Sequence, residues 1–350
     1  MNRRPIRVVV VEDSPTMRAI LHTHLSREGD IEVVACAANA AEGRQMIREL
    51  DPDVVTLDVE MPGMNGLDFL EKIMKLRPTP VIIVSGATQR GNETTARALT
   101  LGAVDCYAKS EISGTLPLDD GGKLARLVRD AAKVSFARDA TPATPVTATP
   151  PPPSLSPADR RGPPKVIVIG SSTGGVEALH TLLSQFPADC PPTLVVQHIN
   201  ERFTAAVAHT LDEACAARVV LAQPDLPLRA GHIYFPPDND RHLLIGGPQT
   251  LRTKLRAGDR ISGHRPSVDA LFLSAAEMVG KDAVGILLTG MGADGASGLL
   301  AMARAGALTI AQDEATCAVF GMPRAAIALG AAGIIAPIDQ IARHTFSKAA

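Results

Sequence analysis

The sequence lacks several features on which large classes of protein depend. It has no tryptophan and only 2 tyrosines, so its cores must be built from valine, isoleucine, leucine and alanine. No apolar run approaches the roughly 18 residues that a membrane-spanning helix needs. The run Val8–Val11 is followed at once by Glu12 and Asp13, and it is too short for the apolar region of a signal peptide. We therefore expect a cytoplasmic protein that is not inserted in a membrane.

Cysteine is scarce and the charge is balanced. The 5 cysteines are scattered and contain no CxxC pair, whereas a disulfide framework or a zinc site would need clustered residues. We expect free thiols at Cys36, Cys106, Cys190, Cys215 and Cys317. The 35 basic and 37 acidic residues leave a net charge of −2 and no basic patch, which argues against nucleic acid as a partner.

The clearest boundary is a proline-rich stretch in the middle of the chain. Residues 139–164 contain 9 of the 27 prolines, many threonines and alanines, and almost no large apolar residue. Such a stretch cannot bury a core and should be extended and semi-rigid. We predict a first domain at residues 1–137, a linker at 138–164 and a second domain at 165–350.

The first domain alternates short β-branched runs with helix-like segments. Ser14 and Pro15 are the residue types of an N-cap and a first helical position, and Leu124 opens a segment with apolar residues at helical spacing. Five βα units predict a parallel sheet with helices on both faces, which binds ligands at the carboxyl ends of its strands. The expected strands are Arg7–Val11, Ile31–Ala35, Val54–Asp58, Val81–Ser85 and Asp105–Ala108.

The second domain has the same alternation without repeating the sequence, and it predicts a second, mostly parallel α/β sheet. The runs Ile233–Phe235 and Leu243–Ile245 resemble a hairpin pair. The other expected strands are Val166–Ile169, Leu194–Gln197, Ala283–Leu288 and Leu308–Gln312. The expected helices are Val176–Phe186, Thr204–Cys215, Val268–Val279 and one from about Gly295 to Ala305.

Five polar residues stand at the ends of the strands expected in the first domain. Glu12 and Asp13 follow the first strand, and Asp58 ends the third. Ser85 ends the fourth strand and Lys109 follows the fifth. Each of them alone is common in a solvated turn, but parallel strands share one carboxyl edge, so all five should converge. Packed carboxylates need a cation such as Mg²⁺, a lysine can hold a phosphoryl oxygen, and a carboxylate can accept a phosphoryl group.

The second domain carries a serine on a glycine-rich turn. The residues from Gly170 to Gly174 join a strand to a helix and fit the pattern G-x-S-x-G, with Ser172 at its centre. The glycines permit a tight turn and close approach of a substrate, and the helix N-terminus offers amides to a developing oxyanion. A phosphate-binding loop and a purely structural turn are the alternative interpretations of this motif.

A serine nucleophile needs a base and a carboxylate that orients the base. His198 follows the expected strand Leu194–Gln197, at a carboxyl strand end. Asp294 lies in a glycine-rich turn after another strand, where it could also simply cap the next helix. Asp269, within an expected helix, and Asp313 are rivals for this position. The order Ser–His–Asp differs from that of the α/β-hydrolases, so this triad would be a separate arrangement.

The first domain also resembles a known family. Over residues 5–137, the stretches VVVEDSPTMR, VTLDVEMPGMNGLDFLEKIM and VIIVSGAT resemble the receiver domains of response regulators, which have a flavodoxin-like fold. The resemblance implies that Asp58 is the phosphoacceptor. It also implies that Asp13 and Asp58 hold Mg²⁺, with assistance from Glu12.

The same resemblance gives Ser85 and Lys109 supporting roles at the phosphorylation site. The family usually has proline after this lysine, whereas here Ser110 follows it. The next stretch, EISGTLPLDDGG, is long and rich in glycine and aspartate, so the resemblance does not extend to the geometry of this loop.

The second domain resembles another family. Five stretches spread over residues 166–328 resemble the catalytic domain of chemotaxis protein-glutamate methylesterases, the CheB family. They are IGSSTGGVEAL, VVQHI, SGHRPSVDALF, LLTGMGADGASGL and VFGMPRAAI. The resemblance implies that Ser172, His198 and Asp294 form a catalytic triad. Together with the receiver, it covers essentially the whole chain outside the linker.

Further residues of the active site follow from this second resemblance. It implies that the backbone amide of Met291 is an oxyanion donor and that Thr173 and His264 are neighbours of the active site. Ser171 stands where the family often has alanine. It is a rival nucleophile only if the turn is misread.

The two resemblances together imply a function. The expected substrates are γ-glutamyl methyl esters on methyl-accepting chemotaxis receptors, and the expected phosphodonor is a chemotaxis histidine kinase. Deamidation of glutamine is the expected second activity, because both reactions pass through a similar tetrahedral oxyanion. Phosphorylation would need Mg²⁺ at the receiver, whereas the esterase chemistry would need no cofactor. The receiver should restrain the hydrolase until Asp58 is phosphorylated.

Other functions are compatible with parts of the sequence. The hydrolase could act on another ester or amide. The chain could also be a phosphorylation-switched binding module, although the intact set of serine, histidine and aspartate argues against that. A DNA-binding response regulator is disfavoured, because the second domain has no helix-turn-helix pattern and no basic face.

Overall fold

The computed structural model describes residues 4–61, 66–86, 88–111, 120–134, 164–247 and 249–346. The chain forms two compact units, Met1–Phe136 and Ala137–Ala350, each with a sheet and a core of its own. The expected linker at 138–164 lies outside the described residues except for its last residue, so the three-part division stays a prediction. The loop that begins at 112 also lies outside them, up to residue 119.

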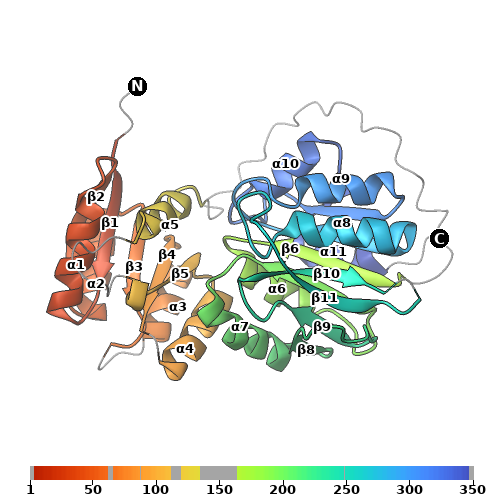
Figure 1. Ribbon diagram of the computed structural model, residues 1–350. Coiled ribbons are helices and arrows are strands. Elements are labelled where there is room, and N and C mark those ends of the chain that lie inside the picture. The colour runs from red at the N-terminus through yellow and green to blue at the C-terminus, as the bar shows by residue number, and fades with distance from the viewer. Residues whose placement is uncertain are drawn as a thin grey trace. The chain divides into compact units, whose positions relative to one another are not determined.

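The first unit is built on a five-stranded parallel sheet with the order β2-β1-β3-β4-β5 (Figure 1). The chain leaves β1 first toward β2 and then toward β3, which is the doubly wound order of flavodoxin-like folds. All five expected strands are confirmed, and the last three have the expected bounds. The strands are β1 (Ile6–Val11), β2 (Ile31–Ala37), β3 (Val54–Asp58), β4 (Val81–Ser85) and β5 (Asp105–Ala108).

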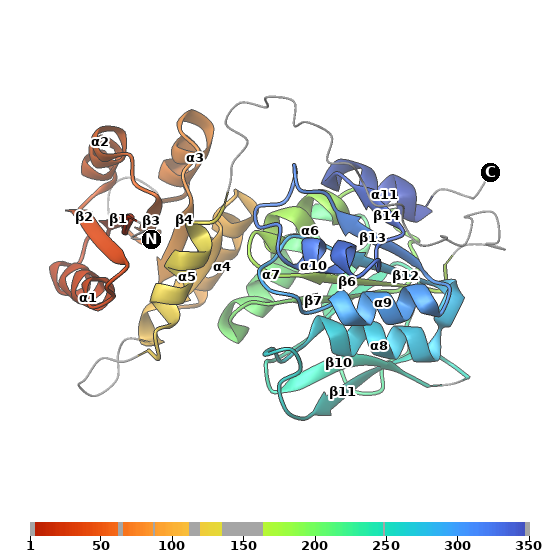
Figure 2. The same ribbon diagram turned by 90° about the horizontal axis from the view of Figure 1, so that it is seen from above.

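Helices cover both faces of this sheet. The helices α1 and α5 pack on one face, and α2, α3 and α4 lie on the other (Figure 2). The expected start of α1 is confirmed, since Ser14 Oγ accepts the N–H of Met17 at 3.3 Å and Pro15 is the first helical residue. The helices are α1 (Pro15–Ser26), α2 (Ala40–Leu50), α3 (Gly66–Leu76), α4 (Gln89–Thr100), α5 (Lys123–Ala131) and the short 3-10 helix η1 (Lys109–Glu111).

The second unit is built on a seven-stranded, wholly parallel sheet with the order β14-β13-β12-β6-β7-β9-β8. From the central β6 the chain proceeds to β7 on one side and later returns to β12 on the other. Ligands of such sheets bind at the carboxyl edge where the direction changes. The strands are β6 (Val166–Ser171), β7 (Thr193–Gln197), β8 (Arg218–Leu221), β9 (His232–Phe235), β12 (Ala283–Leu287), β13 (Leu308–Gln312) and β14 (Ile334–Ala336).

The expected hairpin of Ile233–Phe235 with Leu243–Ile245 is wrong. The first run belongs to β9, which lies between β7 and β8 in the parallel sheet. The second belongs to β10 (Arg241–Gly246), which pairs antiparallel with β11 (Arg252–Ala257). β11 alternates basic residues with others and contains no apolar run, so its sequence does not resemble a buried strand.

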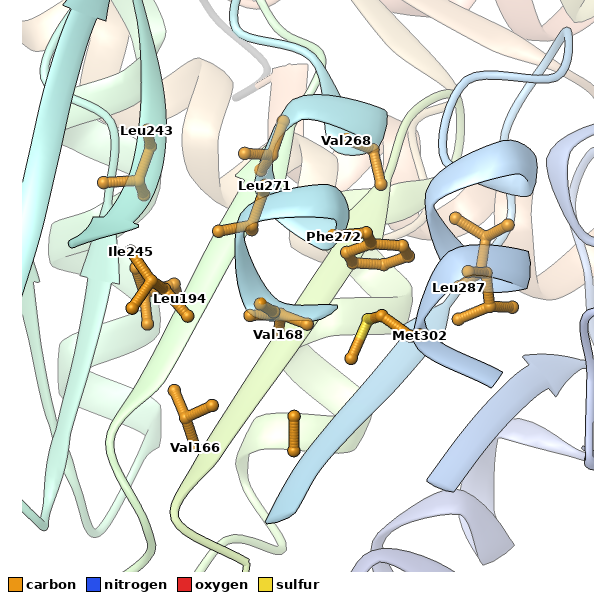
Figure 3. Close-up of a cluster of buried hydrophobic side chains, with 14 of the residues drawn as sticks. Val166, Val168, Leu194, Leu243, Ile245, Val268, Leu271, Phe272, Leu287 and Met302 are labelled. Atoms are coloured by element: carbon orange, nitrogen blue, oxygen red, sulfur yellow. The ribbon is translucent and has the colours of Figure 1, made fainter. Parts of the chain in front are cut away.

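Helices lie on both faces of the second sheet, and a large apolar cluster fills the space on the side of α8 (Figures 2 and 3). In this cluster Phe272 of α8 points toward Leu287 and Met302, whereas Leu243 and Ile245 of β10 lie on the other side of the helix. The ribbon β10–β11 is thereby attached to the sheet through α8. The helices are α6 (Gly175–Leu183), α7 (Glu201–Ala214), α8 (Val268–Met278), α9 (Ala296–Arg304), α10 (Met322–Ala328), α11 (Ile338–Phe346) and the 3-10 helix η3 (Gly280–Asp282).

Two expectations from composition can be compared with the structure. All five cysteines are free thiols. Of the helices in the described part of the chain, none combines the length and the apolar character that crossing a membrane requires.

Candidate active site and phosphoacceptor site

The serine of the G-x-S-x-G turn lies at the carboxyl edge of the second sheet, next to the point where the chain changes direction. β6 ends at Ser171 and α6 begins at Gly175, so Ser172 occupies the tight turn between them. Its N–H donates to the carbonyl of Thr289 beyond β12 at 3.0 Å, and its carbonyl accepts the N–H of Gly175 at 2.7 Å. Ser172 is therefore fixed between β6 and the loop after β12.

Two glycines make this turn possible. A Cβ at Gly170 would collide with a methyl group of Val268 at the start of α8. Gly174 has a φ of +72°, and a Cβ there would collide with the side chain of Ala318. Glycine is thus required both for the left-handed conformation and for the close approach of neighbouring segments.

The adjacent Ser171 faces the interior. It is completely buried, and its hydroxyl donates to Gln197 Oε1 at 2.6 Å. The amide of Gln197 in turn donates to the carbonyls of Ser172 at 2.8 Å and His198 at 2.9 Å. Ser171 therefore helps to join the ends of β6 and β7, while Ser172 keeps 9% of its surface exposed.

His198 follows β7 and approaches the serine turn from the neighbouring strand. The backbone N–H of His198 donates to the carbonyl of Ser171 at 3.0 Å. Its ring Nε2 lies 2.9 Å from Asp294 Oδ2. Its Nδ1 is buried and, within the described residues, makes no hydrogen bond. In the same part of the chain no hydrogen bond joins this ring to the hydroxyl of Ser172, so Nδ1 is the nitrogen left to face a reacting group.

Asp294 binds the N-terminus of α8 in addition to the histidine. Its Oδ2 accepts the N–H of Val268 at 2.8 Å, and its Oδ1 accepts the N–H of Asp269 at 2.9 Å and the hydroxyl of Ser267 at 2.7 Å. Burial alone would raise the pKa of Asp294. The hydrogen bond and charge of His198 outweigh burial, together with the hydrogen bonds from Asp269 N–H and the Ser267 hydroxyl. In net they lower the pKa of Asp294 below its usual value.

The two rival aspartates lie elsewhere. Asp269 is buried within α8, where it accepts the N–H of Gly298 at 2.7 Å and the hydroxyl of Ser262 at 2.7 Å. Asp313 accepts hydrogen bonds from Thr316. Both rivals therefore hold loops and helices together, and within the described residues neither of them forms a hydrogen bond with His198. The sequence also allowed Asp294 to cap the helix that follows it, α9. In the structure Asp294 caps the N-terminus of α8 instead.

His264 stacks on His198. The ring centroids are 3.8 Å apart and the ring planes differ by 3°. Burial first, and then the positive charges of His198 and Arg260, lower the pKa of His264 to about 4. A ring that is neutral at neutral pH thus covers one face of His198.

Thr173 and Met291 border the serine turn. The carbonyl of Thr173 accepts the hydroxyl of Thr289 at 3.0 Å. Met291 follows Gly290, at which a Cβ would lie 2.7 Å from Ser172 Cβ. The β12–α9 loop therefore passes directly against the serine. Sequence reasoning missed Ser267, whose position before α8 is the pattern of an N-cap serine.

The polar strand ends of the first unit form a compact cluster. Carboxylate oxygens of Glu12, Asp13 and Asp58 all lie within 4.8 Å of one another. Lys109 Nζ lies 2.6 Å from Asp58 and 2.9 Å from Glu12. Ser85 ends β4 beside β3, and its hydroxyl donates to the carbonyl of Gly91 at 3.3 Å rather than to a carboxylate.

The charges in this cluster oppose one another. Burial, together with the charge of Asp58, raises the pKa of Glu12 to about 6. Burial by itself lowers the pKa of Lys109, but the hydrogen bond and charge of Asp58 and the contact with Glu12 raise it in net. One lysine charge thus stands against three carboxyl groups, and an additional cation would relieve the remaining repulsion.

Comparisons with known proteins agree with both units. Residues 8–117 match the response regulator receiver domain, and residues 167–345 match CheB methylesterase. A protein-glutamate methylesterase/protein-glutamine glutaminase 1 of Caulobacter vibrioides is 51% identical over 326 residues, which are 93% of this chain and 93% of that protein. One of Rhizobium johnstonii is 47% identical, over 99% of this chain and 97% of its own length.

The chain belongs to the CheB methylesterase family. The crystal structure of the Thermotoga maritima CheB methylesterase catalytic domain is 34% identical to it, with a TM-score of 0.51, and covers 52% of this chain and 97% of that one. The family membership and the α/β fold expected from the sequence are thus confirmed. The roles of individual residues rest on the geometry described above.

Proposed function

We propose that this chain is a phosphorylation-activated protein-glutamate methylesterase that hydrolyses glutamyl methyl esters on methyl-accepting chemotaxis receptors, and that it also deamidates glutamines. The relatives carry both activities in their names and match nearly the whole chain. The observation that carries the proposal is the buried contact of His198 with Asp294 beside Ser172, on a turn that needs its glycines.

In the proposed reaction Ser172 attacks the ester carbonyl while His198 accepts its proton. Because Nε2 faces Asp294, the proton goes to Nδ1, and Nε2–H remains donated to the carboxylate. Asp294 fixes this tautomer and stabilises the imidazolium that forms. The proton then passes to methanol as it leaves, because methoxide is too basic to depart unaided. Water hydrolyses the acyl-enzyme, again with His198 as the base.

Neighbouring groups support this chemistry. We assign the oxyanion to the backbone amide of Met291, which follows the glycine packed against Ser172, and the peptide at Thr173 borders the same space. His264 adds no charge beside the imidazolium at neutral pH, because its pKa is about 4. Its stacked ring also keeps water from one face of His198.

In the receiver, we propose that Asp58 takes up the phosphoryl group from a chemotaxis histidine kinase. Glu12, Asp13 and Asp58 fit Mg²⁺, since three hard oxygen donors lie within 4.8 Å and their repulsion calls for a cation. A bound Mg²⁺ would neutralise charge on the transferring group. Lys109 holds one phosphoryl oxygen. Ser85 turns its hydroxyl away from the carbonyl of Gly91 and donates to a second phosphoryl oxygen.

Regulation follows from joining the two units by the proposed linker, 138–164, between domains at 1–137 and 165–350. Phosphorylation adds about −1.5 to −2 charge to the receiver, which can shift a docked interface. We propose that the unphosphorylated receiver restrains the hydrolase and that the protein acts in the cytoplasm, where the receptor helices and the kinase present their groups.

Trapping of the acyl-enzyme tests the proposed chemistry. Brief reaction with a γ-glutamyl methyl ester peptide followed by acid quenching should leave an acyl group on the peptide that contains Ser172, detected by mass spectrometry. A phosphorylation-switched binding module would leave no adduct. Modification of Ser171 instead would move the nucleophile by one residue.

A further inference from the structure

The antiparallel ribbon carries a row of cations. Arg252, Lys254 and Arg256 alternate along β11, so they share one face of the ribbon. Lys254 and Arg256 are exposed, and so is Arg260 in the loop that follows. Arg252 pairs with Asp225, but within the described residues none of the other three forms an ion pair.

Strand register places the end of this row beside the active site. Arg256 pairs with His242 of β10, and paired residues of antiparallel strands lie about 4.5–5.5 Å apart at Cα. His242 Nδ1 accepts the N–H of Ser267 at 3.2 Å. The hydroxyl of Ser267 donates to Asp294 at 2.7 Å. A continuous series of contacts thus connects the cationic strand to the carboxylate that binds His198.

The loop after β11 brings a further cation to the same place. It spans residues 258–267 and carries both Arg260 and His264, whose ring stacks on that of His198 at 3.8 Å. Burial is the main cause of the low pKa of His264, but the charge of Arg260 contributes to it. The chain also doubles back here, because Ile261 and His264 exchange backbone hydrogen bonds of 3.0 and 2.9 Å. Arg260 therefore adjoins the segment that carries the stacked His264 ring.

The acidic groups nearby do not cancel this charge. Asp238 binds Arg241, and Asp240 binds Arg265 at 3.4 Å, so these two carboxylates are already paired. Asp259 is exposed beside Arg260 and is the acidic neighbour of the row within the loop. The surface formed by Lys254, Arg256 and Arg260, called the cationic strip below, keeps a net positive charge.

We propose that the cationic strip docks an acidic, glutamate-rich segment of the protein substrate beside the ester that Ser172 attacks. The inference rests on the proposed function. A protein methylated on glutamates presents a free carboxylate wherever a methyl group is absent, so its charge complements the strip. Exposed cations at the rim of a site steer encounter and favour partners of opposite charge. The strip would therefore favour a protein substrate over a small ester, because a small ester is too short to contact Ser172 and the strip at once.

The test compares two substrates on full-length protein. One is a methylated, soluble cytoplasmic fragment of a receptor, and the other is a short neutral peptide with one γ-glutamyl methyl ester. The variant is Lys254→Glu with Arg256→Glu; Arg260 is kept because its charge reaches His264. The matched control is Lys281→Glu with Arg304→Glu, since both residues are exposed and stand at the opposite edge of the sheet, before β12 and at the end of α9.

The strip variant should raise KM for the receptor fragment about 10-fold at low salt and leave kcat within about twofold. Its kinetics on the neutral peptide should match those of the wild type within about twofold, and the difference on the fragment should shrink in about 0.5 M salt. The control pair should change neither substrate.

Several outcomes would overturn the strip. An unchanged KM for the fragment, or an equal rise in the control pair, would remove it. Loss of binding to anionic lipid vesicles with an unchanged KM would assign the cations to a membrane surface instead. A wild-type protein that hydrolyses neither substrate would overturn the proposed function and the strip with it, whereas hydrolysis of both by all variants alike overturns the strip alone.

Discussion

The two units place carboxylates at the same edge of the same type of sheet, yet the surroundings give them opposite properties. In the receiver, Glu12 lies buried against Asp58, and its pKa rises to about 6. In the catalytic unit, Asp294 is also buried, but the amides of α8, Ser267 and His198 lower its pKa. The receiver site is thus short of positive charge, which suits the cation and the phosphoryl group that we propose bind there. In the catalytic unit, by contrast, both oxygens of Asp294 already accept hydrogen bonds.

The largest expected effect is the loss of esterase activity in a variant that leaves the receiver intact. Ser172→Ala should lower methylesterase activity by about 10⁴-fold or more, because it removes the hydroxyl that we propose attacks the ester. Phosphate uptake at Asp58 should be unchanged, since the receiver is a separate unit. The assay is methanol release from methylated receptors, with phosphodonor uptake measured in parallel.

The neighbouring serine provides the control for this variant. Ser171→Ala removes a buried hydrogen bond to Gln197 and should cost about 1 kcal/mol of stability while retaining activity. If Ser172→Ala kept substantial activity and Ser171→Ala lost it, the interpretation of the turn would be wrong.

A smaller loss of activity is expected from replacing Asp294, the carboxylate whose pKa is lowered whereas that of Glu12 in the receiver is raised. Asp294→Asn should lower kcat about 10³–10⁴-fold, because an uncharged amide cannot stabilise the imidazolium of His198. The amide oxygen can still accept from Ser267 and Asp269, whereas the NH2 group replaces the oxygen that accepts from Val268 and faces His198. Circular dichroism should show that the catalytic unit remains folded. A kcat within about tenfold of the wild type would show that Asp294 serves mainly as the cap of α8.

Disabling the receiver should have a regulatory effect only. Asp58→Asn should keep basal esterase activity and lose the response to phosphodonor, which we expect to be about 5–150-fold in the wild type. A chain shortened to residues 160–350 should be faster than unphosphorylated full-length protein. If it is no faster, restraint by the receiver is not the brake, and direct activation by the phosphorylated receiver explains the response better.

The smallest effect concerns pH. Because folding raises the pKa of Glu12 from 4.5 to about 6, the folded receiver binds a proton more tightly than the unfolded one. The associated stability is present below pH 4.5 and is lost as the pH rises through 6. We expect a loss on the order of 1 kcal/mol after solvent screening, and Mg²⁺ should offset it.

Urea unfolding of the receiver transition at pH 4.5 and pH 7.5 measures this effect. Glu12→Gln serves as the reference, since it cannot ionise but keeps most of the shape of the side chain. An equal pH dependence in the wild type and in Glu12→Gln would show that other groups cause it.

Much of the architecture could be predicted because its signals are local. Buried parallel strands appear as apolar runs, and Ser14 with Pro15 marks the start of α1, so both sheets were expected. β11 was missed because its strand residues are basic, and Ile233–Phe235 was paired wrongly because two apolar runs close in sequence suggest a hairpin. Only the tertiary structure shows whether two neighbouring apolar runs pair with each other or belong to different sheets.

The sites show the same division. Ser172, His198 and Asp294 stand where strands end, and strand ends can be read from sequence. The stacking of His264 and the support of Asp294 by Ser267 arise from a loop that returns from a distant ribbon. No local pattern reports such contacts, because they depend on how α8 packs against the sheet.

Methanol release from methylated receptor membranes, with and without a small phosphodonor, is the most direct single measurement. The wild type should release methanol slowly alone and faster with the phosphodonor and Mg²⁺, and this acceleration should be absent from Asp58→Asn. Release that is absent under both conditions, or that does not respond to phosphorylation of Asp58, would contradict a methylesterase controlled by its receiver.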